Sequence, residues 1–179
     1  MNLDDLKVIR LTPDYIVKPF DCGDLDLNEF LLKESENYQK QLIATTYLIE
    51  RKETTVAFYS LLNDKVSIAD TPSKSSWRKY FRDTFPQGKR FFSYPAVKIG
   101  RLAVDLNYQS KGLGTFIMDS IKGNLIENPK TGCKYITVDA YRQSLNYYEK
   151  NGFKYMTSSD EKEDTRLMYF DLITLSEIT

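Results

Sequence analysis

Apolar residues recur every three to four positions in three segments, which predicts helices over residues 25–40, 112–125 and 143–150. The first segment has acidic residues near its start, where the positive end of a helix dipole stabilises them. The last segment is short and is followed by Asn151 and Gly152, which is a typical helix end.

Segments outside these helices are rich in β-branched and aromatic residues, which favour strands. They are residues 45–50, 55–62, 97–105, 135–140, 153–156 and 167–172. The polar "RKET" between the first two predicts a hairpin. The order strand, helix, strand from residue 97 to residue 140 predicts a right-handed crossover between parallel strands. The sequence therefore predicts an α+β domain with a mixed sheet.

The composition is that of one globular domain, which we predict to span residues 1–179. The first residues, "MNLDDLKVIR", fit no secretory or transit peptide, and no apolar run approaches the roughly 18 residues of a membrane span. We therefore expect a cytoplasmic protein without membrane contact. In that compartment Cys22 and Cys133 are expected to be thiols rather than a disulfide.

The chain contains no histidine, which narrows the available chemistry. The absence excludes serine–histidine and cysteine–histidine nucleophile pairs, zinc proteases with an H-E-x-x-H motif and histidine-containing zinc deaminases. Proton transfer must then use carboxylates, tyrosine, cysteine, lysine or water. We expect no metal cofactor.

A polar turn with glycines, "YQSKGLG", joins a predicted strand to a predicted helix. Such a turn presents unpaired N–H groups and the positive end of a helix dipole, which is how proteins hold phosphate. Gly112 and Gly114 would let the backbone approach an anion, although glycines in such turns often serve tight packing alone. A Walker A loop needs Gly-Lys-Ser/Thr and does not fit, because Lys111 precedes Gly112 and Leu113 follows it, so the hydroxyl that binds magnesium is missing. A dinucleotide-binding fingerprint comes closer but has Ile117 in place of its third glycine.

Two motifs in this part of the chain resemble the GNAT superfamily of acyl-CoA N-acyltransferases. "QSKGLG" is similar to the family's pyrophosphate loop, and "LAV" before it is similar to the strand beside pantetheine. "VDAYRQSLNYYEKNGF" is similar to the family's strand and helix that end in Tyr-x-x-x-Gly-Phe. The resemblance implies a central mixed, mostly antiparallel sheet with a splayed parallel strand pair and helices on both faces. It also implies acetyl-CoA as cosubstrate, held by Leu102, Ala103, Val104, Gln109, Ser110, Lys111, Gly112, Leu113, Gly114 and Ser144.

Two positions depart from the family pattern. Tyr141 stands where many members have Asn, which removes one hydrogen bond to pantetheine. Ser110 stands where Gly is frequent, and the loop tolerates a serine there if its φ is negative.

A narrower resemblance covers nearly the whole chain. "FDCGDLDLNEFL", "VAFYSL" and "IGRLAVDLNYQSKGLG" are similar to the toxin branch of the superfamily, whose members acetylate the amino group of aminoacyl-tRNA. That branch usually has Asp where Asn28 stands, Gly where Ala57 stands, and a basic surface, whereas the formal net charge here is zero. The resemblance implies aminoacyl-tRNA as the acceptor, and we also consider an antitoxin protein and a homodimer. The alternatives are a small amine or a protein amine as acceptor, a non-catalytic acyl-CoA-binding module, and a nucleotide-dependent oxidoreductase.

Acyl transfer requires an amine that loses a proton, a stabilised oxyanion and a protonated leaving thiolate. For the oxyanion we expect a backbone N–H of residues 102–104. For the leaving group the resemblance points to Tyr148, with Tyr147 as the competing choice because adjacent helical residues point about 100° apart. A phenol with a pKa of about 10 is a weaker acid than a thiol of about 8.5, so this transfer is uphill unless the site lowers the phenol pKa. The general base is Asp105, Asp139 or a relay of water and backbone.

Three other side chains each have a functional and a structural interpretation. Lys111 either adds a cation to the phosphate loop or is a solvated turn residue. Arg101, in an apolar strand, is paired inside or meets the 3′-phosphate or the substrate. Cys22, without a cationic neighbour in the sequence, fits a small structural thiol better than a nucleophile.

Basic residues are concentrated between residues 65 and 101, with nine basic side chains against two acidic ones. Aromatic residues are interleaved with them, and this combination suits a phosphate backbone with unstacked bases. The alternative is that the aromatic residues are core and the basic ones lie on a solvated face. We predict that the segment binds the acceptor through Arg78, Lys79, Arg82, Lys89 and Arg90.

Overall fold

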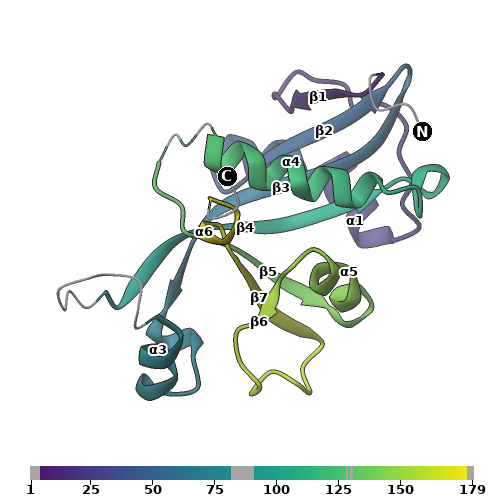
Figure 1. The fold of residues 1–179 in the computed structure, drawn as a ribbon. Helices are drawn as coiled ribbons and strands as arrows, with labels where there is room; N and C mark the ends of the chain where they lie inside the picture. The colour runs from purple at the N-terminus through teal and green to yellow at the C-terminus, as the bar shows by residue number, and fades with distance from the viewer. Residues whose placement is uncertain (1–4, 82–90, 128, 130, 177–179) are drawn as a thin grey trace. The chain divides into compact units, whose positions relative to one another are not determined.

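The computed structural model describes residues 5–81, 91–127, 129 and 131–176, with the side chains of these residues except 79–81 and 176 (Figure 1). The chain forms two compact units. Unit 1 comprises Met1–Leu62 and Ile99–Ile121, and unit 2 comprises Asn63–Lys98 and Lys122–Thr179. Within the described ranges, no helix has the length and apolar character needed to cross a membrane. The single domain expected from the composition stays a prediction.

A seven-stranded sheet has the strand order β1-β2-β3-β4-β5-β7-β6. Its strands are β1 (Lys7–Arg10), β2 (Thr45–Arg51), β3 (Thr54–Ser67), β4 (Ser93–Val104), β5 (Tyr135–Tyr141), β6 (Lys154–Tyr155) and β7 (Thr165–Asp171). The pair β4–β5 is parallel, with Ala96 opposite Tyr135 and Lys98 opposite Thr137. The pairs β1–β2, β2–β3, β5–β7 and β6–β7 are antiparallel. The predicted α+β class and mixed sheet are therefore confirmed.

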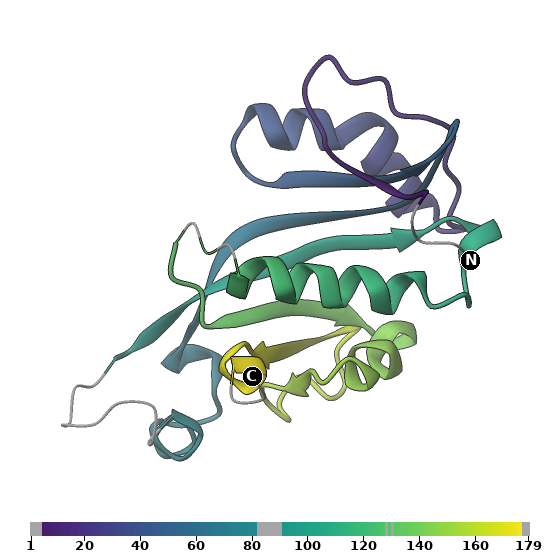
Figure 2. The same ribbon diagram turned by 45° about the horizontal axis from the view of Figure 1, so that its top comes forward.

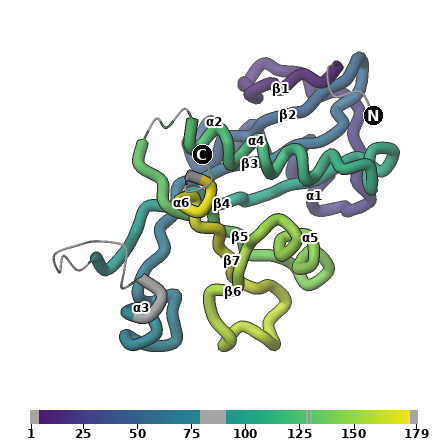
Figure 3. Tube along the Cα trace, viewed as in Figure 1, coloured from purple at the N-terminus to yellow at the C-terminus, as the bar shows by residue number. Residues whose placement is uncertain are grey.

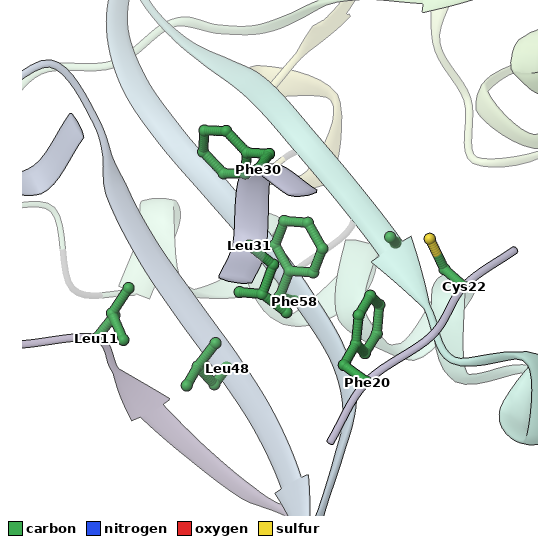
Figure 4. Close-up of a cluster of buried hydrophobic side chains, with 8 residues drawn as sticks. Leu11, Phe20, Cys22, Phe30, Leu31, Leu48 and Phe58 are labelled. Atoms are coloured by element: carbon green, nitrogen blue, oxygen red, sulfur yellow. The ribbon is translucent and has the colours of Figure 1, made fainter. Parts of the chain in front are cut away.

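In unit 1, one long helical segment lies along β2 (Figure 2). It consists of α1 (Leu25–Glu29), a π-helical turn η1 (Phe30–Glu34) and α2 (Ser35–Lys40), so the helix predicted over 25–40 is confirmed. Its apolar side joins a core cluster with the hairpin of β2 and β3, which Figure 4 shows. The cluster contains Leu11, Phe20, Cys22, Phe30, Leu31, Leu48, Phe58 and Ala103. Unit 1 is thus stabilised by aromatic and aliphatic packing.

In unit 2, β5, β7 and β6 lie side by side (Figure 3). Trp77, from helix α3 (Lys74–Phe81), stacks on Tyr94 of β4 with 5.6 Å between ring centroids. Tyr94 in turn meets Tyr135 of β5 edge to face at 6.0 Å. Trp77 and Tyr94 are therefore core residues, as the structural alternative for the aromatic segment predicted, whereas Phe92 is 71% exposed.

The remaining helices are α4 (Leu113–Glu127), α5 (Leu145–Lys150) with the 3-10 turn η4 (Arg142–Ser144) before it, the 3-10 turn η2 (Ile68–Asp70) and α6 (Ile173–Ser176). Both α4 and α5 were predicted within two residues of their observed starts. The elements β1, α3 and α6 were not predicted. In β1 only Ile9 is even partly buried, so this strand carries no apolar alternation.

Candidate functional site

The glycine-containing loop leads from β4 into α4 and lies in unit 1. β4 ends at Val104, and Asp105 caps the 3-10 helix η3 (Leu106–Tyr108) by accepting a hydrogen bond from the Asn107 N–H at 2.9 Å. Residues 109–112 form a turn, and α4 begins at Leu113. The predicted placement of this loop at the N-terminus of a long helix is confirmed. A helix start directs backbone N–H groups and a positive partial charge toward such a loop.

Two residues of this loop adopt left-handed backbone conformations. Ser110 has a φ of 58° and Gly112 a φ of 81°. The condition of a negative φ at Ser110 is therefore not met, because the chain passes from η3 into α4 over only four residues and uses both positions for the bend. A non-glycine residue in this region costs roughly 1–2 kcal/mol, so Ser110 is a strained position. A Cβ on Gly112 would meet nothing within 4 Å, so the space beside this glycine is open.

The other loop side chains bind the protein's own backbone. The Gln109 amide donates to the carbonyl oxygens of Cys22 at 3.0 Å and Val104 at 2.9 Å. Lys111 Nζ donates to the Asn107 carbonyl oxygen at 2.6 Å and lies 5.7 Å from the centre of the Tyr108 ring. Both side chains therefore shape the turn, and their contact with a cofactor stays a prediction.

The residues of β4 and α4 beside the loop differ in the exposure of their side chains. Ala103 and Leu113 are buried, so these two residues would meet a cofactor through their backbone only. Leu102 and Val104 are half-buried. Gly114 is the second residue of α4 and has no positive φ, so the backbone does not require a glycine there.

The two candidate general bases are both engaged. Asp105 is buried and accepts hydrogen bonds from the Asp21 N–H at 3.1 Å and from both nitrogens of Asn107. Asp139, in unit 2, forms a salt bridge with Lys98 at 2.8 Å between Oδ2 and Nζ. Asp105 is thus the N-cap of η3.

Tyr148 lies in unit 2, on α5, and is 6% exposed. Its ring meets Phe153 at 5.3 Å and Tyr147 at 5.0 Å between centroids, both edge to face. Burial raises the pKa of the Tyr148 phenol well above its ordinary value. The site therefore does not lower this pKa, and the phenol is neutral near physiological pH.

A buried lysine that the sequence analysis did not single out supports the end of α5. Lys122 Nζ donates to the Asn151 carbonyl oxygen at 2.7 Å and lies 4.1 Å from the centre of the Phe170 ring. Asn151 in turn donates from its side chain to the Tyr147 carbonyl oxygen at 2.8 Å, and the Phe153 N–H donates to the Tyr148 carbonyl oxygen at 3.0 Å. Lys122 could have been noticed, because it stands on the apolar side of the predicted helix.

The remaining candidate site residues either lie on other elements or lie outside the described residues. Ser144 is half-buried and makes no side-chain cap to α5. Arg78 is exposed on α3, whereas the side chain of Lys79 and the whole of Arg82, Lys89 and Arg90 lie outside the described residues. The acceptor site predicted on these five residues stays a prediction.

Arg101 and Cys22 have structural partners in unit 1. The Arg101 guanidinium lies 5.0 Å from the centre of the Phe30 ring and donates to the Gly100 carbonyl oxygen at 2.8 Å. The Cys22 thiol lies 3.1 Å from Asn28 Oδ1, and burial raises its pKa. A thiol of raised pKa is a poor nucleophile, which favours the structural interpretation of Cys22.

Comparisons with known proteins agree with this architecture. Residues 89–172 match the family model of the acetyltransferase (GNAT) domain. The structure of AtaT complexed with acetyl-methionyl-tRNAfMet is 23% identical, aligns over 97% of this chain and 99% of its own, and has a TM-score of 0.74. AtaTR bound with AcCoA is 24% identical over 98% and 99% of the two chains, with a TM-score of 0.72. A tyrosine-to-phenylalanine mutant of KacT is 20% identical over 98% and 99%, with a TM-score of 0.71.

Proposed function

We propose that this chain, which carries a GNAT acetyltransferase domain on a GNAT fold, transfers an acetyl group from acetyl-CoA directly to a primary amine. The observation that carries the proposal is the loop at the start of α4, where a left-handed turn leaves open space beside Gly112. Backbone N–H groups and the helix dipole bind a pyrophosphate in such a loop. Residues 102–104 and 109–114, with Ser144, are the residues that we assign to acetyl-CoA.

The transfer forms a C–N bond to the amine and breaks the C–S bond to CoA. The amine loses one proton and the CoA sulfur gains one, so no further reactant is needed. We assign Tyr148 as the side chain that faces the CoA sulfur. Its phenol is neutral because burial raises its pKa. A raised pKa makes complete proton transfer to a thiolate more unfavourable. Tyr148 therefore acts first as a hydrogen-bond donor to the sulfur.

The amine proton goes to a relay of water and backbone groups. This alternative is favoured because Asp105 is used as a buried cap and Asp139 is paired with Lys98. A backbone N–H of residues 102–104 is our choice for the group that stabilises the developing oxyanion.

The acceptor that we favour is the amino group of aminoacyl-tRNA, in the cytoplasm. AtaT, whose fold this chain shares, has been solved with acetyl-methionyl-tRNAfMet and also with the antitoxin AtaR. The concentration of basic residues between residues 65 and 101 supports an RNA acceptor. Because AtaT has been solved with the antitoxin AtaR, we also propose an antitoxin protein as partner. A small amine or a protein amine remains the alternative acceptor.

Calorimetry with acetyl-CoA and with NAD tests the cosubstrate. We expect binding of acetyl-CoA and none of NAD. Release of free CoA in the presence of an amine acceptor then separates an enzyme from a module that only holds acyl-CoA. A protein that binds NAD and has no affinity for CoA would refute the proposal.

A further inference from the structure

A network of hydrogen bonds connects the candidate acetyl-CoA loop to a turn near the N-terminus, residues 21–28, which we call the N-terminal turn. The Gln109 side chain bridges the two, because its amide donates both to the Cys22 carbonyl oxygen and to the Val104 carbonyl oxygen. The Leu106 N–H donates to the Asp21 carbonyl oxygen at 2.8 Å. In the other direction, the Asp21 N–H donates to Asp105 Oδ2 at 3.1 Å. Hydrogen bonds to the N-terminal turn thus hold both the end of β4 and the start of the loop.

Asn28 organises the N-terminal turn from within. Its Oδ1 accepts from the Cys22 N–H at 3.0 Å, so Asn28 sets the peptide that precedes the carbonyl used by Gln109. Its Nδ2 donates to Asp21 Oδ1 at 2.7 Å, and the same oxygen accepts from the Gly23 N–H at 2.8 Å. These donors, the Gly23 N–H first and Asn28 second, hold the pKa of Asp21 below its usual value. Asn28 therefore holds the Asp21–Cys22 peptide directly and, through the Asp21 carboxylate, the Cys22–Gly23 peptide whose carbonyl oxygen accepts from Gln109.

The loop needs such external support because its own backbone is strained. Ser110 and Gly112 both have left-handed φ angles, and Ser110 lacks the freedom of a glycine. Strained backbone persists only where surrounding contacts over-determine it. From outside the loop, the hydrogen bonds of Asp105, Leu106 and Gln109 with the N-terminal turn fix its conformation.

We propose that the N-terminal turn is a positioning element for the acetyl-CoA loop, in which Asn28 acts through Gln109 and Asp105 and touches no cofactor atom itself. The inference rests on the proposed function, because it takes the loop to be the acetyl-CoA site. It changes the role of Gln109 from a cofactor contact to a positioning residue, whose side chain is already used by two carbonyl groups. It also gives a function to the segment "FDCGDLDLNEFL", which the chemistry of transfer alone leaves unexplained.

The test measures acetyl-CoA affinity in variants that break the network. Asn28→Leu is nearly isosteric and removes both the acceptor and the donor, and we expect the Kd for acetyl-CoA to rise about tenfold. Gln109→Leu should raise the Kd by a similar factor. If both residues act through the same contact, the double variant should lose about tenfold as well, rather than the roughly hundredfold of independent sites.

Asp24→Ala is the matched control. Asp24 caps α1 by accepting from the Leu27 N–H at 3.1 Å, so this variant destabilises the same turn without removing any contact to the loop. We expect a lowered Tm and an unchanged Kd for acetyl-CoA. A merely structural role of Asn28 would instead make Asn28→Leu behave like this control.

Amide hydrogen exchange of residues 110–114 in the free protein gives a readout that does not depend on the ligand. Positioning predicts faster exchange of the loop in Gln109→Leu, a variant at an exposed residue that folds even if Asn28→Leu does not. A raised Kd with unchanged loop exchange would show direct contact of Gln109 with the cofactor and overturn the inference. Wild-type protein that fails to bind acetyl-CoA would refute the proposed function instead, so the two failures are distinguishable.

Discussion

Gly112→Ala isolates the backbone conformation of the loop, because a Cβ at this position would meet nothing within 4 Å. Its effect on stability therefore comes from φ alone. A non-glycine residue at a φ of 81° loses roughly 1–2 kcal/mol. The smaller conformational entropy of alanine in the unfolded chain returns about 0.4–1 kcal/mol. We expect the free energy of unfolding to fall by about 1 kcal/mol.

Gly123→Ala is the matched control for this change. Gly123 lies inside α4, has no positive φ, and would also place its Cβ in open space. Alanine in a helix interior is favoured over glycine by about 0.8–1 kcal/mol, so this variant should be more stable than wild type. The same added methyl group thus has opposite effects at the two positions, and urea unfolding resolves a difference of about 2 kcal/mol.

Acetyl-CoA binding by the same two variants tests the role of the loop. The open space beside Gly112 is where the pyrophosphate would approach, so Gly112→Ala should weaken binding at least about tenfold and Gly112→Val should abolish it. Gly123→Ala should bind as wild type does. A Gly112→Ala variant as stable as Gly123→Ala would contradict the left-handed φ. Loss of stability with unchanged affinity would show that acetyl-CoA binds elsewhere.

Three other substitutions test the remaining assignments. Tyr148→Phe should lower kcat on the order of 10²-fold and leave acetyl-CoA affinity near wild type, whereas Tyr147→Phe should change turnover little, and steady-state kinetics that reverse this order would reassign the role to Tyr147. Lys122→Met removes the donor to the Asn151 carbonyl oxygen and the cation over Phe170, so we expect a loss of about 1–2 kcal/mol in urea unfolding, and an equal effect from the exposed Lys154→Met would refute it. Asn28→Leu removes one of the two donors that lower the pKa of Asp21, so that pKa should rise toward the ordinary value of a carboxyl group. A lowered carboxyl pKa stabilises the fold above the unfolded pKa, and this contribution is lost as the pH falls from the unfolded to the folded pKa. The variant should therefore be less stable than wild type near neutral pH and lose less stability on acidification, and NMR titration of the Asp21 carboxyl carbon that shows no shift would contradict the contact.

Local patterns were sufficient where one face of an element is buried. The helix over 25–40 and the long helix α4 were predicted because their apolar residues repeat at helical spacing. The structure buries several of these side chains, including Phe30, Leu31, Leu113, Ile117 and Ile121. The spacing gave no sign of the π-helical turn at Phe30–Glu34, since an extra residue in one turn changes the repeat only locally. β3 extends five residues beyond the predicted strand, through a polar stretch that no apolar pattern marks.

The sequence motifs located the loop of the candidate site, but they did not determine its backbone conformation or its long-range contacts. The loop and its helix could be located, but the φ of Ser110 could not be predicted, because the short connection between η3 and α4 imposes a backbone conformation that serine itself does not favour. The partners of Gln109 could not be predicted either, since its contact to Cys22 joins residues 87 positions apart. Long-range hydrogen bonds of this kind have no local sequence signal.

The most direct measurement is transfer of radiolabel from acetyl-CoA to a pool of aminoacylated tRNAs. With wild-type protein we expect label in the RNA fraction, on the amino acid, with a steep decline as salt rises, and we expect little label with Tyr148→Phe. Deacylation of the tRNA should release the label with the amino acid. Absence of label in RNA, in a preparation that binds acetyl-CoA and releases CoA to another amine, would contradict an RNA acceptor, and absence of any transfer would contradict the acetyltransferase itself.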